Sequence, residues 1–204
     1  MRLPPAYDRR NRNIYQQDTT YMVNTKILGI CGSLRKASLN MAALRAARAS
    51  APDGVTLEIA DISDIPVYNE ENYAEGFPPA VNAFRAKIKA ADALLFATPE
   101  YNYSIPGVLK NAIDWASRPP EHPFSGKAVG MLGCSAGTSG TMRAQYHLRQ
   151  VMVFLDMRPI NKPEVFLPAA GNLFDKNQNL TDDGVAGRLA DLLAALAAWS
   201  KKVA

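Results

Sequence analysis

The sequence GSLRKASLN occupies residues 32–40 and directly follows the apolar run KILGIC of residues 26–31. This run is apolar on both faces, which is typical of a central strand in a parallel sheet. A buried strand that leads through a Gly/Ser loop into a helix gathers backbone N–H groups at one point, and such a point binds anions. We therefore expect this loop to bind phosphate, and a capping loop without any ligand is the alternative. The side chains suited to donate hydrogen bonds to the phosphate are Ser33, Arg35, Ser38 and Asn40.

Strands and helices alternate along the rest of the chain. Further strands are expected at residues 55–59, 93–97, 128–133 and, as a short strand, within 158–167. Helices are expected at residues 39–50, 80–91, from about 106, at 141–155, and at 182–201 with Thr181 as its cap. This order predicts an α/β protein with a flavodoxin-like, doubly wound, five-stranded parallel sheet. Because residues 55–59 alternate apolar and polar, that strand belongs at an edge, and the expected strand order is 2-1-3-4-5.

The chain is long enough for one full domain, which we place at residues 25–204, after an N-terminal arm at residues 1–24. The arm shows no helical or strand periodicity and is expected to be flexible. The formal net charge of +4 is too small to indicate nucleic-acid binding. No secretory signal or membrane span is visible, so we expect a cytoplasmic protein without membrane association. The histidines and the two cysteines form no ligand cluster, so no metal site is expected.

Three loops follow the expected central strands, at residues 32–40, 99–105 and 134–140. In a sheet of this order, ligands bind beyond the carboxyl ends of the strands, between the first and third. The second loop carries Tyr101 and Tyr103, and the small residues of the third loop leave space for a flat ring. A phosphate pocket beside a flat slot predicts a mononucleotide ligand. The GxGxxG and P-loop patterns are absent from the sequence, which argues against a dinucleotide as the main cofactor.

Three segments resemble the NADPH-dependent FMN reductase family of flavodoxin-like enzymes, which includes bacterial quinone and chromate reductases. They are GSLRKASLN (32–40), PEYNYSIPGVLKNAIDWASRP (99–119) and SAGTSGTMRAQYHLRQ (135–150). The resemblance implies FMN as the cofactor, with its phosphate bound by Ser33, Arg35, Ser38 and Asn40. It implies ring contacts from Pro99, Glu100, Tyr101, Asn102, Tyr103, Ser135 and Gly137. Many members carry Gly-Gly where this chain has Gly140-Thr141.

The resemblance also implies an activity. The expected enzyme takes hydride from NADPH or NADH and passes electrons through FMN to a quinone, a flavin, a metal oxyanion or another small acceptor, in ping-pong order. The cofactor carries this chemistry, so no catalytic side chain is expected, and no Ser/His/Asp or Cys/His constellation is visible. The alternative is a flavodoxin-type FMN electron carrier that does not oxidise NAD(P)H, and a third option is a regulatory flavoprotein. Such carriers generally have an acidic surface, whereas this chain is basic and has Arg35 in its loop.

The helix expected at residues 141–155 carries more apolar side chains than one sheet-facing stripe requires. We expect the excess to be buried against another subunit, in a homodimer or a homotetramer, and the resemblance points the same way. Arg143, Tyr146 and Glu164 are expected at or close to the contact, where Arg143 and Glu164 could pair.

Overall fold

A computed structural model describes residues 24–204, so the arm predicted at residues 1–24 lies almost entirely outside the described residues. The central sheet contains β1 (Thr25–Cys31), β2 (Val55–Ala60), β3 (Ala93–Ala97), β4 (Ala128–Cys134) and β5 (Arg158–Pro159). Its order is β2-β1-β3-β4-β5, and each neighbouring pair is parallel. The predicted order 2-1-3-4-5 is therefore confirmed, with the half-exposed strand β2 at the edge.

The short fifth strand is divided into two pieces. β5 pairs with the beginning of β4, and β6 (Val165–Leu167) pairs with its end. Pro159 and Pro163 have no backbone N–H, so this stretch cannot form a continuous hydrogen-bonded ladder. The carboxyl end of β4 consequently gains its own partner strand directly beside the third loop.

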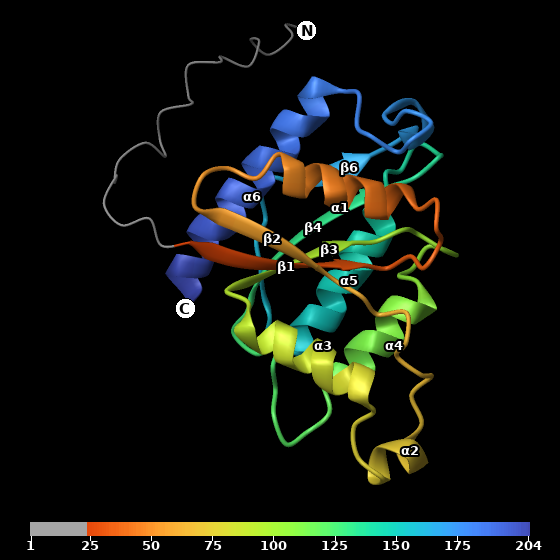
Figure 1. Cartoon of the computed structure of the whole chain (residues 1–204), viewed down its shortest axis with the longest axis vertical. Coiled ribbons are helices and arrows are strands. Elements are labelled where there is room, and N and C mark those ends of the chain that lie inside the picture. The colour runs from red at the N-terminus through yellow and green to blue at the C-terminus, as the bar shows by residue number, and fades with distance from the viewer. Residues whose placement is uncertain (1–23) are drawn as a thin grey trace, which may run out of the picture.

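Helices cover both faces of the sheet (Figure 1). α1 (Leu39–Ala49) and α6 (Asp183–Val203) lie on one face, and α3 (Pro79–Ala90), α4 (Gly107–Ala116) and α5 (Met142–Phe154) lie on the other. Successive residues of a strand point to opposite faces. Thus Ile27 packs with α1 and α6, whereas Leu28 packs with the opposite set of helices.

Two helical features differ from the prediction. Asp182, not Thr181, caps α6, because the Asp182 carboxylate accepts a 2.8 Å hydrogen bond from the Val185 N–H while the Thr181 hydroxyl donates to the Leu173 carbonyl. The carboxylate also suits the positive end of the helix dipole. In addition, a short helix α2 (Glu70–Ala74) lies between the strand and the helix expected at residues 55–59 and 80–91, where no helix was expected.

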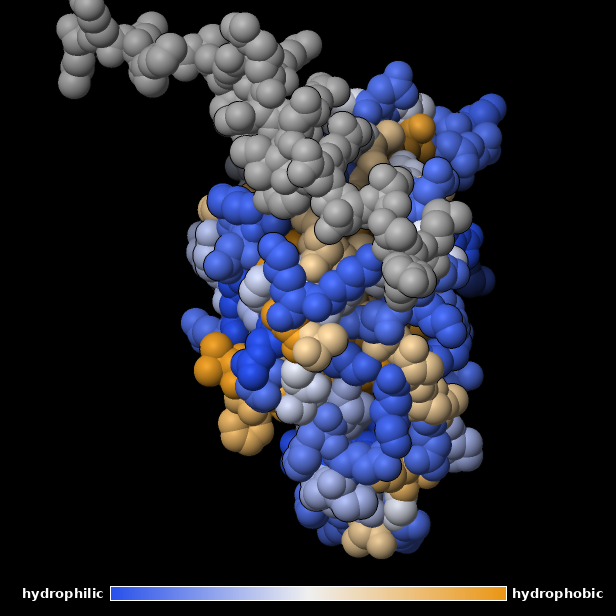
Figure 2. Space-filling view, turned by 90° about the vertical axis from the view of Figure 1, so that its left-hand side faces the viewer, coloured by the Kyte–Doolittle hydropathy of each residue, from blue (hydrophilic) through white to orange (hydrophobic). Residues whose placement is uncertain are grey.

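The surface is mostly hydrophilic on the side shown in Figure 2, with apolar side chains gathered at one edge. At the C-terminal end of α5, Val153 and Phe154 are 80% and 87% exposed. None of the helices within residues 24–204 has both the length and the apolar character to cross a membrane.

Candidate functional site

The three loops after β1, β3 and β4 meet at the carboxyl edge of the sheet, on the right-hand side of Figure 1. Gly32 permits the close approach of the first and second loops. A Cβ atom at Gly32 would lie 3.0 Å from the Pro106 ring and 3.2 Å from the Pro99 ring. A larger residue would push these loops apart, since proline rings have little freedom to move.

The first loop, residues 32–38, is folded by its own serines. The Ser33 hydroxyl accepts the Arg35 N–H at 3.4 Å, and the Ser38 hydroxyl accepts the Met41 N–H at 3.2 Å, which caps α1. Ser33 and Ser38 are buried, whereas residues 34–37 are exposed.

Several backbone donors of this loop are free. Within residues 24–204, the N–H groups of Leu34, Lys36 and Ala37 make no hydrogen bond. The Arg35 guanidinium donates to the Ala37 carbonyl at 3.0 Å and stays exposed. Unpaired amides, an exposed guanidinium and the start of α1 thus surround one point, and this arrangement suits a phosphate dianion.

Asn40 has a second task besides its expected phosphate contact. Its side-chain amide donates to the Cys134 carbonyl at 3.1 Å and accepts the Cys134 N–H at 2.9 Å, and the side chain is buried. An amide has two N–H donors, so one of them is left for a ligand. Asn40 therefore joins the first loop to the third.

The two cysteines at this edge are inert. Burial raises the pKa of the Cys134 thiol to about 12 and also raises the pKa of the Cys31 thiol. The reactive form of cysteine is the thiolate, so neither side chain is suited to nucleophilic chemistry at neutral pH.

The second loop contains a tight turn over Tyr101–Ser104. Tyr101 and Ser104 exchange two backbone hydrogen bonds of 3.0 and 2.9 Å, and the φ angles of Asn102 and Tyr103 are 51° and 66°. Two left-handed central residues define a type I′ turn, which here contains no glycine. The Tyr101 and Tyr103 side chains are exposed, whereas Pro99 is buried.

The Glu100 carboxylate binds to α5 of the same chain. One carboxylate oxygen accepts the Arg143 Nε–H at 2.7 Å, and the other accepts the Ala144 N–H in the first turn of α5 at 3.2 Å. The Arg143 guanidinium also lies over the Tyr103 ring, 4.0 Å from its centre. Because the Glu100 carboxylate is already bound, the backbone of Glu100 is left for the expected ring contact.

The third loop is a compact small-residue wall. The Ser135 hydroxyl donates to the Gly137 carbonyl at 3.1 Å and accepts the Gly140 N–H at 3.0 Å. The segment after β6 also contacts this loop, because the Ala169 N–H donates to the Gly137 carbonyl. A Cβ atom at Gly137 would meet nothing within 4 Å, so the space beside this wall is open and suits a flat ring.

Thr141 follows the third loop directly. Its φ angle is 68°, in the left-handed region that favours glycine, and the residue is fully buried. Its hydroxyl accepts a hydrogen bond from the Gln145 amide at 3.3 Å, and that amide also donates to the Val165 carbonyl. Buried hydrogen bonds thus hold Thr141 in this conformation.

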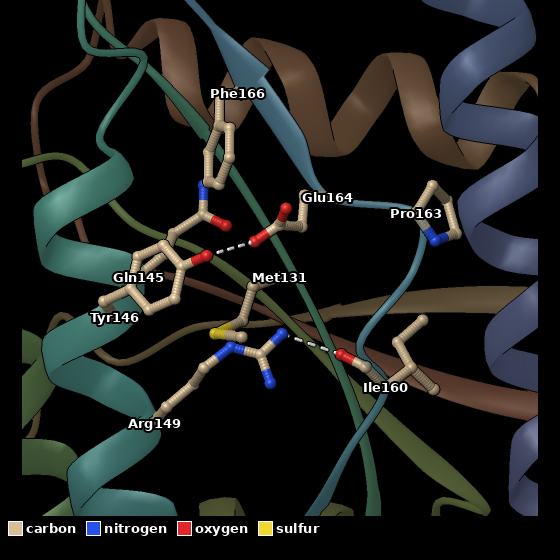
Figure 3. A pocket seen from close by; sticks show the side chains of 8 residues that line it. All are labelled: Met131, Gln145, Tyr146, Arg149, Ile160, Pro163, Glu164 and Phe166. Carbon is tan, nitrogen blue, oxygen red and sulfur yellow. Dashed lines mark hydrogen bonds between the residues drawn. The ribbon is translucent and has the colours of Figure 1, made fainter.

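The residues expected at a subunit contact have partners in their own chain. Tyr146 donates its hydroxyl hydrogen to Glu164 at 2.7 Å (Figure 3). The Lys162 ammonium lies 2.8 Å from the same carboxylate. The hydrogen bonds from Lys162 and Tyr146 lower the pKa of Glu164. Arg143 is bound to Glu100, as described above. An Arg143–Glu164 pair between subunits would have to compete with these contacts.

The cavity beside Tyr146 and Glu164 does not qualify as a ligand site. It lies between α5 and the segment that leads into β6, and Figure 3 shows the side chains that line it. Its volume of about 10 Å³ is enough for a single water molecule at most.

Some features of the site had no signal in the sequence. The Asn40–Cys134 bonds join residues 94 positions apart, and the Glu100–Arg143 pair spans 43 positions. The packing of Gly32 against Pro99 and Pro106 depends in the same way on the folded arrangement.

These features define a flavodoxin-like protein with a candidate anion-binding site at the carboxyl edge of its sheet. Residues 25–172 match the family described as NADPH-dependent FMN reductase. The chain belongs to this family, and the expected family and fold are confirmed.

Relatives of known name agree with this assignment. An NAD(P)H-dependent FMN reductase of Pseudomonas aeruginosa is 61% identical over 178 residues, which cover 87% of this chain and 96% of the relative. A quinone reductase of Escherichia coli is 40% identical over 181 residues, with coverage of 87% and 96%. Among solved structures, the flavoenzyme NAD(P)H:(acceptor) oxidoreductase FerB of Paracoccus denitrificans superposes with a TM-score of 0.80 at 31% identity, over 88% of this chain and 98% of FerB.

Proposed function

We propose that this protein is an FMN-dependent NAD(P)H oxidoreductase that reduces a quinone or another small acceptor. The observation that carries the proposal is the set of unpaired amides in the first loop, which lies at the same edge of the sheet as the second loop and the open position beside Gly137. The names of the relatives support both NAD(P)H and quinone as substrates. Bound FMN would supply the redox chemistry, by accepting a hydride and passing on two electrons.

The protein's own residues would bind and orient the reactants. The free amides of Leu34, Lys36 and Ala37, together with Arg35, would hold the phosphate. Rigid loops held by Gly32 and Glu100 would fix the angle of the ring. Such positioning lowers the barrier to hydride transfer without a side-chain acid or base.

The site residues expected from the sequence keep their proposed roles with one refinement. Ser33, Ser38 and Arg35 would bind the phosphate from the first loop, and Asn40 would contribute its one remaining N–H. Pro99, Tyr101, Asn102 and Tyr103 would line one side of the ring, and Ser135 and Gly137 the other. Glu100 would contribute only its backbone, because its carboxylate is bound to α5.

We also propose a cytoplasmic homodimer or homotetramer with α5 at a subunit contact. Val153 and Phe154 project from the end of this helix as large exposed apolar side chains. Arg143, Tyr146 and Glu164 lie on α5 or beside it and would be at or close to the contact. Burial of such side chains is a common source of subunit affinity.

The central experiment is anaerobic mixing of the purified protein with NADPH and, separately, with NADH. The protein should be yellow, and its visible absorption should bleach rapidly with at least one nucleotide. Bleaching should reverse when a quinone is added. A yellow protein that neither nucleotide bleaches would contradict the enzyme and favour the electron carrier.

A further inference from the structure

The turn at Tyr101–Ser104 requires support from outside its own sequence. Both central residues are left-handed, with φ angles of 51° at Asn102 and 66° at Tyr103. Asparagine tolerates this conformation, whereas tyrosine adopts it rarely. The turn is therefore held by contacts with the rest of the protein.

The turn also carries free donors. Within residues 24–204, the backbone N–H groups of Asn102 and Tyr103 make no hydrogen bond, and both residues are exposed. Free N–H donors of this kind would bind the polar edge of a flat heterocycle. Their contribution to affinity depends on how firmly the turn holds them in position.

α5 supports the turn on both flanks. On the leading side, Glu100 accepts from Arg143 and from the Ala144 N–H. On the trailing side, the Ser104 hydroxyl lies 2.8 Å from Nδ1 of His147 in a hydrogen bond. Residues 143 and 147 are four positions apart, so both anchors come from one face of the helix.

We propose that His147 is a positioning residue for the flavin site, acting through Ser104. The inference rests on the proposed function, because it takes the turn at Tyr101–Ser104 to be a wall of the FMN pocket. His147 itself is exposed, and its bond to Ser104 links two surface elements 43 positions apart. Loss of this bond should therefore loosen the turn, and with it the Asn102 and Tyr103 amides, more than it affects the fold.

The test is FMN titration of the apo form of the full chain, followed by the visible absorption spectrum and midpoint potential of the bound flavin. For His147→Ala, the FMN dissociation constant should rise about fivefold to tenfold, as expected for the loss of one hydrogen bond. The flavin spectrum or potential should also change, since the free amides would meet the ring less precisely. For His147→Asn, affinity should stay within about twofold of the original, because the asparagine amide can occupy the place of Nδ1.

Two further variants make the result specific. Ser104→Ala should reproduce the loss, and the double variant with His147→Ala should be no weaker than either single variant, because both remove one bond. His122→Ala is the matched control, since His122 is exposed and its side chain makes no hydrogen bond within residues 24–204. Circular dichroism should show the same fold for every variant.

The outcomes separate this inference from the proposed function. If the original protein binds FMN and His147→Ala binds it equally well with an unchanged spectrum, the role of His147 is wrong and the flavin site stands. Additive losses in the double variant would also overturn the inference. If the original protein binds no FMN at all, the proposed function itself fails.

Discussion

Asn40 and Cys134 are 94 residues apart in the chain, yet the Asn40 side chain pairs with both backbone polar groups of Cys134. This pair fastens the first turn of α1 to the end of β4. It thus closes the carboxyl edge between the first and third loops of the site.

Asn40→Ala should destabilise the protein by roughly 2–4 kcal/mol, because two buried backbone groups of Cys134 would lose their partner. Urea unfolding of the apo form measures this change. Asn172→Ala is the control, since Asn172 is exposed and its side chain makes no hydrogen bond within residues 24–204. If Asn40→Ala and Asn172→Ala lowered the unfolding free energy equally, the hydrogen bonds between Asn40 and Cys134 would make no specific contribution to stability.

Arg35→Ala should weaken FMN binding with little effect on the fold. The Arg35 side chain is exposed, and its one hydrogen bond among the described residues is to the Ala37 carbonyl of its own loop. Loss of a charged hydrogen bond of about 1.5–3 kcal/mol corresponds to about tenfold to over a hundredfold in affinity. FMN titration of the apo variant tests this, with Arg48→Ala, which removes the same charge from the far end of α1, as the control. An unchanged dissociation constant for Arg35→Ala would refute the phosphate assignment.

Steady-state kinetics should follow a ping-pong pattern. We expect one site beside the second and third loops to serve both substrates, so that the nicotinamide leaves it before the acceptor enters. Double-reciprocal plots against NADPH at several quinone concentrations should therefore be parallel. Intersecting lines would indicate that both substrates bind at once, at separate places.

Cys134 should make the protein less stable at alkaline pH. Its pKa is raised from 9.0 to about 12 by burial. Below pH 9 the thiol is protonated in both states, but at higher pH the unfolded chain loses the proton and the native protein keeps it. This contribution to the unfolding free energy is therefore lost as the pH rises towards 12, by up to about 1.4 kcal/mol per pH unit.

Comparison with Cys134→Ala isolates this effect from other groups that titrate at high pH. Urea unfolding between pH 8 and pH 10.5 should show a steeper decline for the original protein than for the variant. A constant difference between the two over this range would contradict the shifted pKa.

Self-association should depend on the end of α5. The double substitution of Val153 and Phe154 by serine should raise the dissociation constant of the oligomer by at least about tenfold to a hundredfold, the effect of losing about 1.5–3 kcal/mol for burial of just one large apolar side chain. Light scattering of the FMN-bound protein at micromolar concentration measures the mass. Val67→Ser is the control, since Val67 is 82% exposed and lies in the connection before α2. A monomer mass for the original protein would rule out the proposed oligomer.

The sheet could be predicted from the sequence because its strands have clear patterns. Val55, Leu57 and Ile59 alternate with polar residues and placed β2 at the edge, whereas the apolar runs of β1, β3 and β4 placed those strands inside. The division into β5 and β6 could not be predicted, because a two-residue and a three-residue strand leave no periodicity to detect.

α2 was missed for a different reason. It has only five residues, so tertiary contacts rather than helical propensity hold it. The Asn69 side chain caps its first turn, and the Tyr73 hydroxyl donates to the Pro119 carbonyl, far along the chain.

The loops of the candidate site could be located from the sequence, but the contacts that shape these loops could not. Glu100 reads as a solvated loop carboxylate until α5 is seen beside it.

Both edges of the sheet are poor templates for an incoming strand. At one edge, β2 presents alternating polar residues, and its Glu58 forms a 2.8 Å ion pair with Lys87. At the other edge, β5 is only two residues long and contains Pro159, which has no N–H to offer, and β6 is only three residues long. Short, charged or proline-bearing edges discourage the strand-to-strand joining that leads to aggregation. This protein should therefore resist fibril-like association even at high concentration.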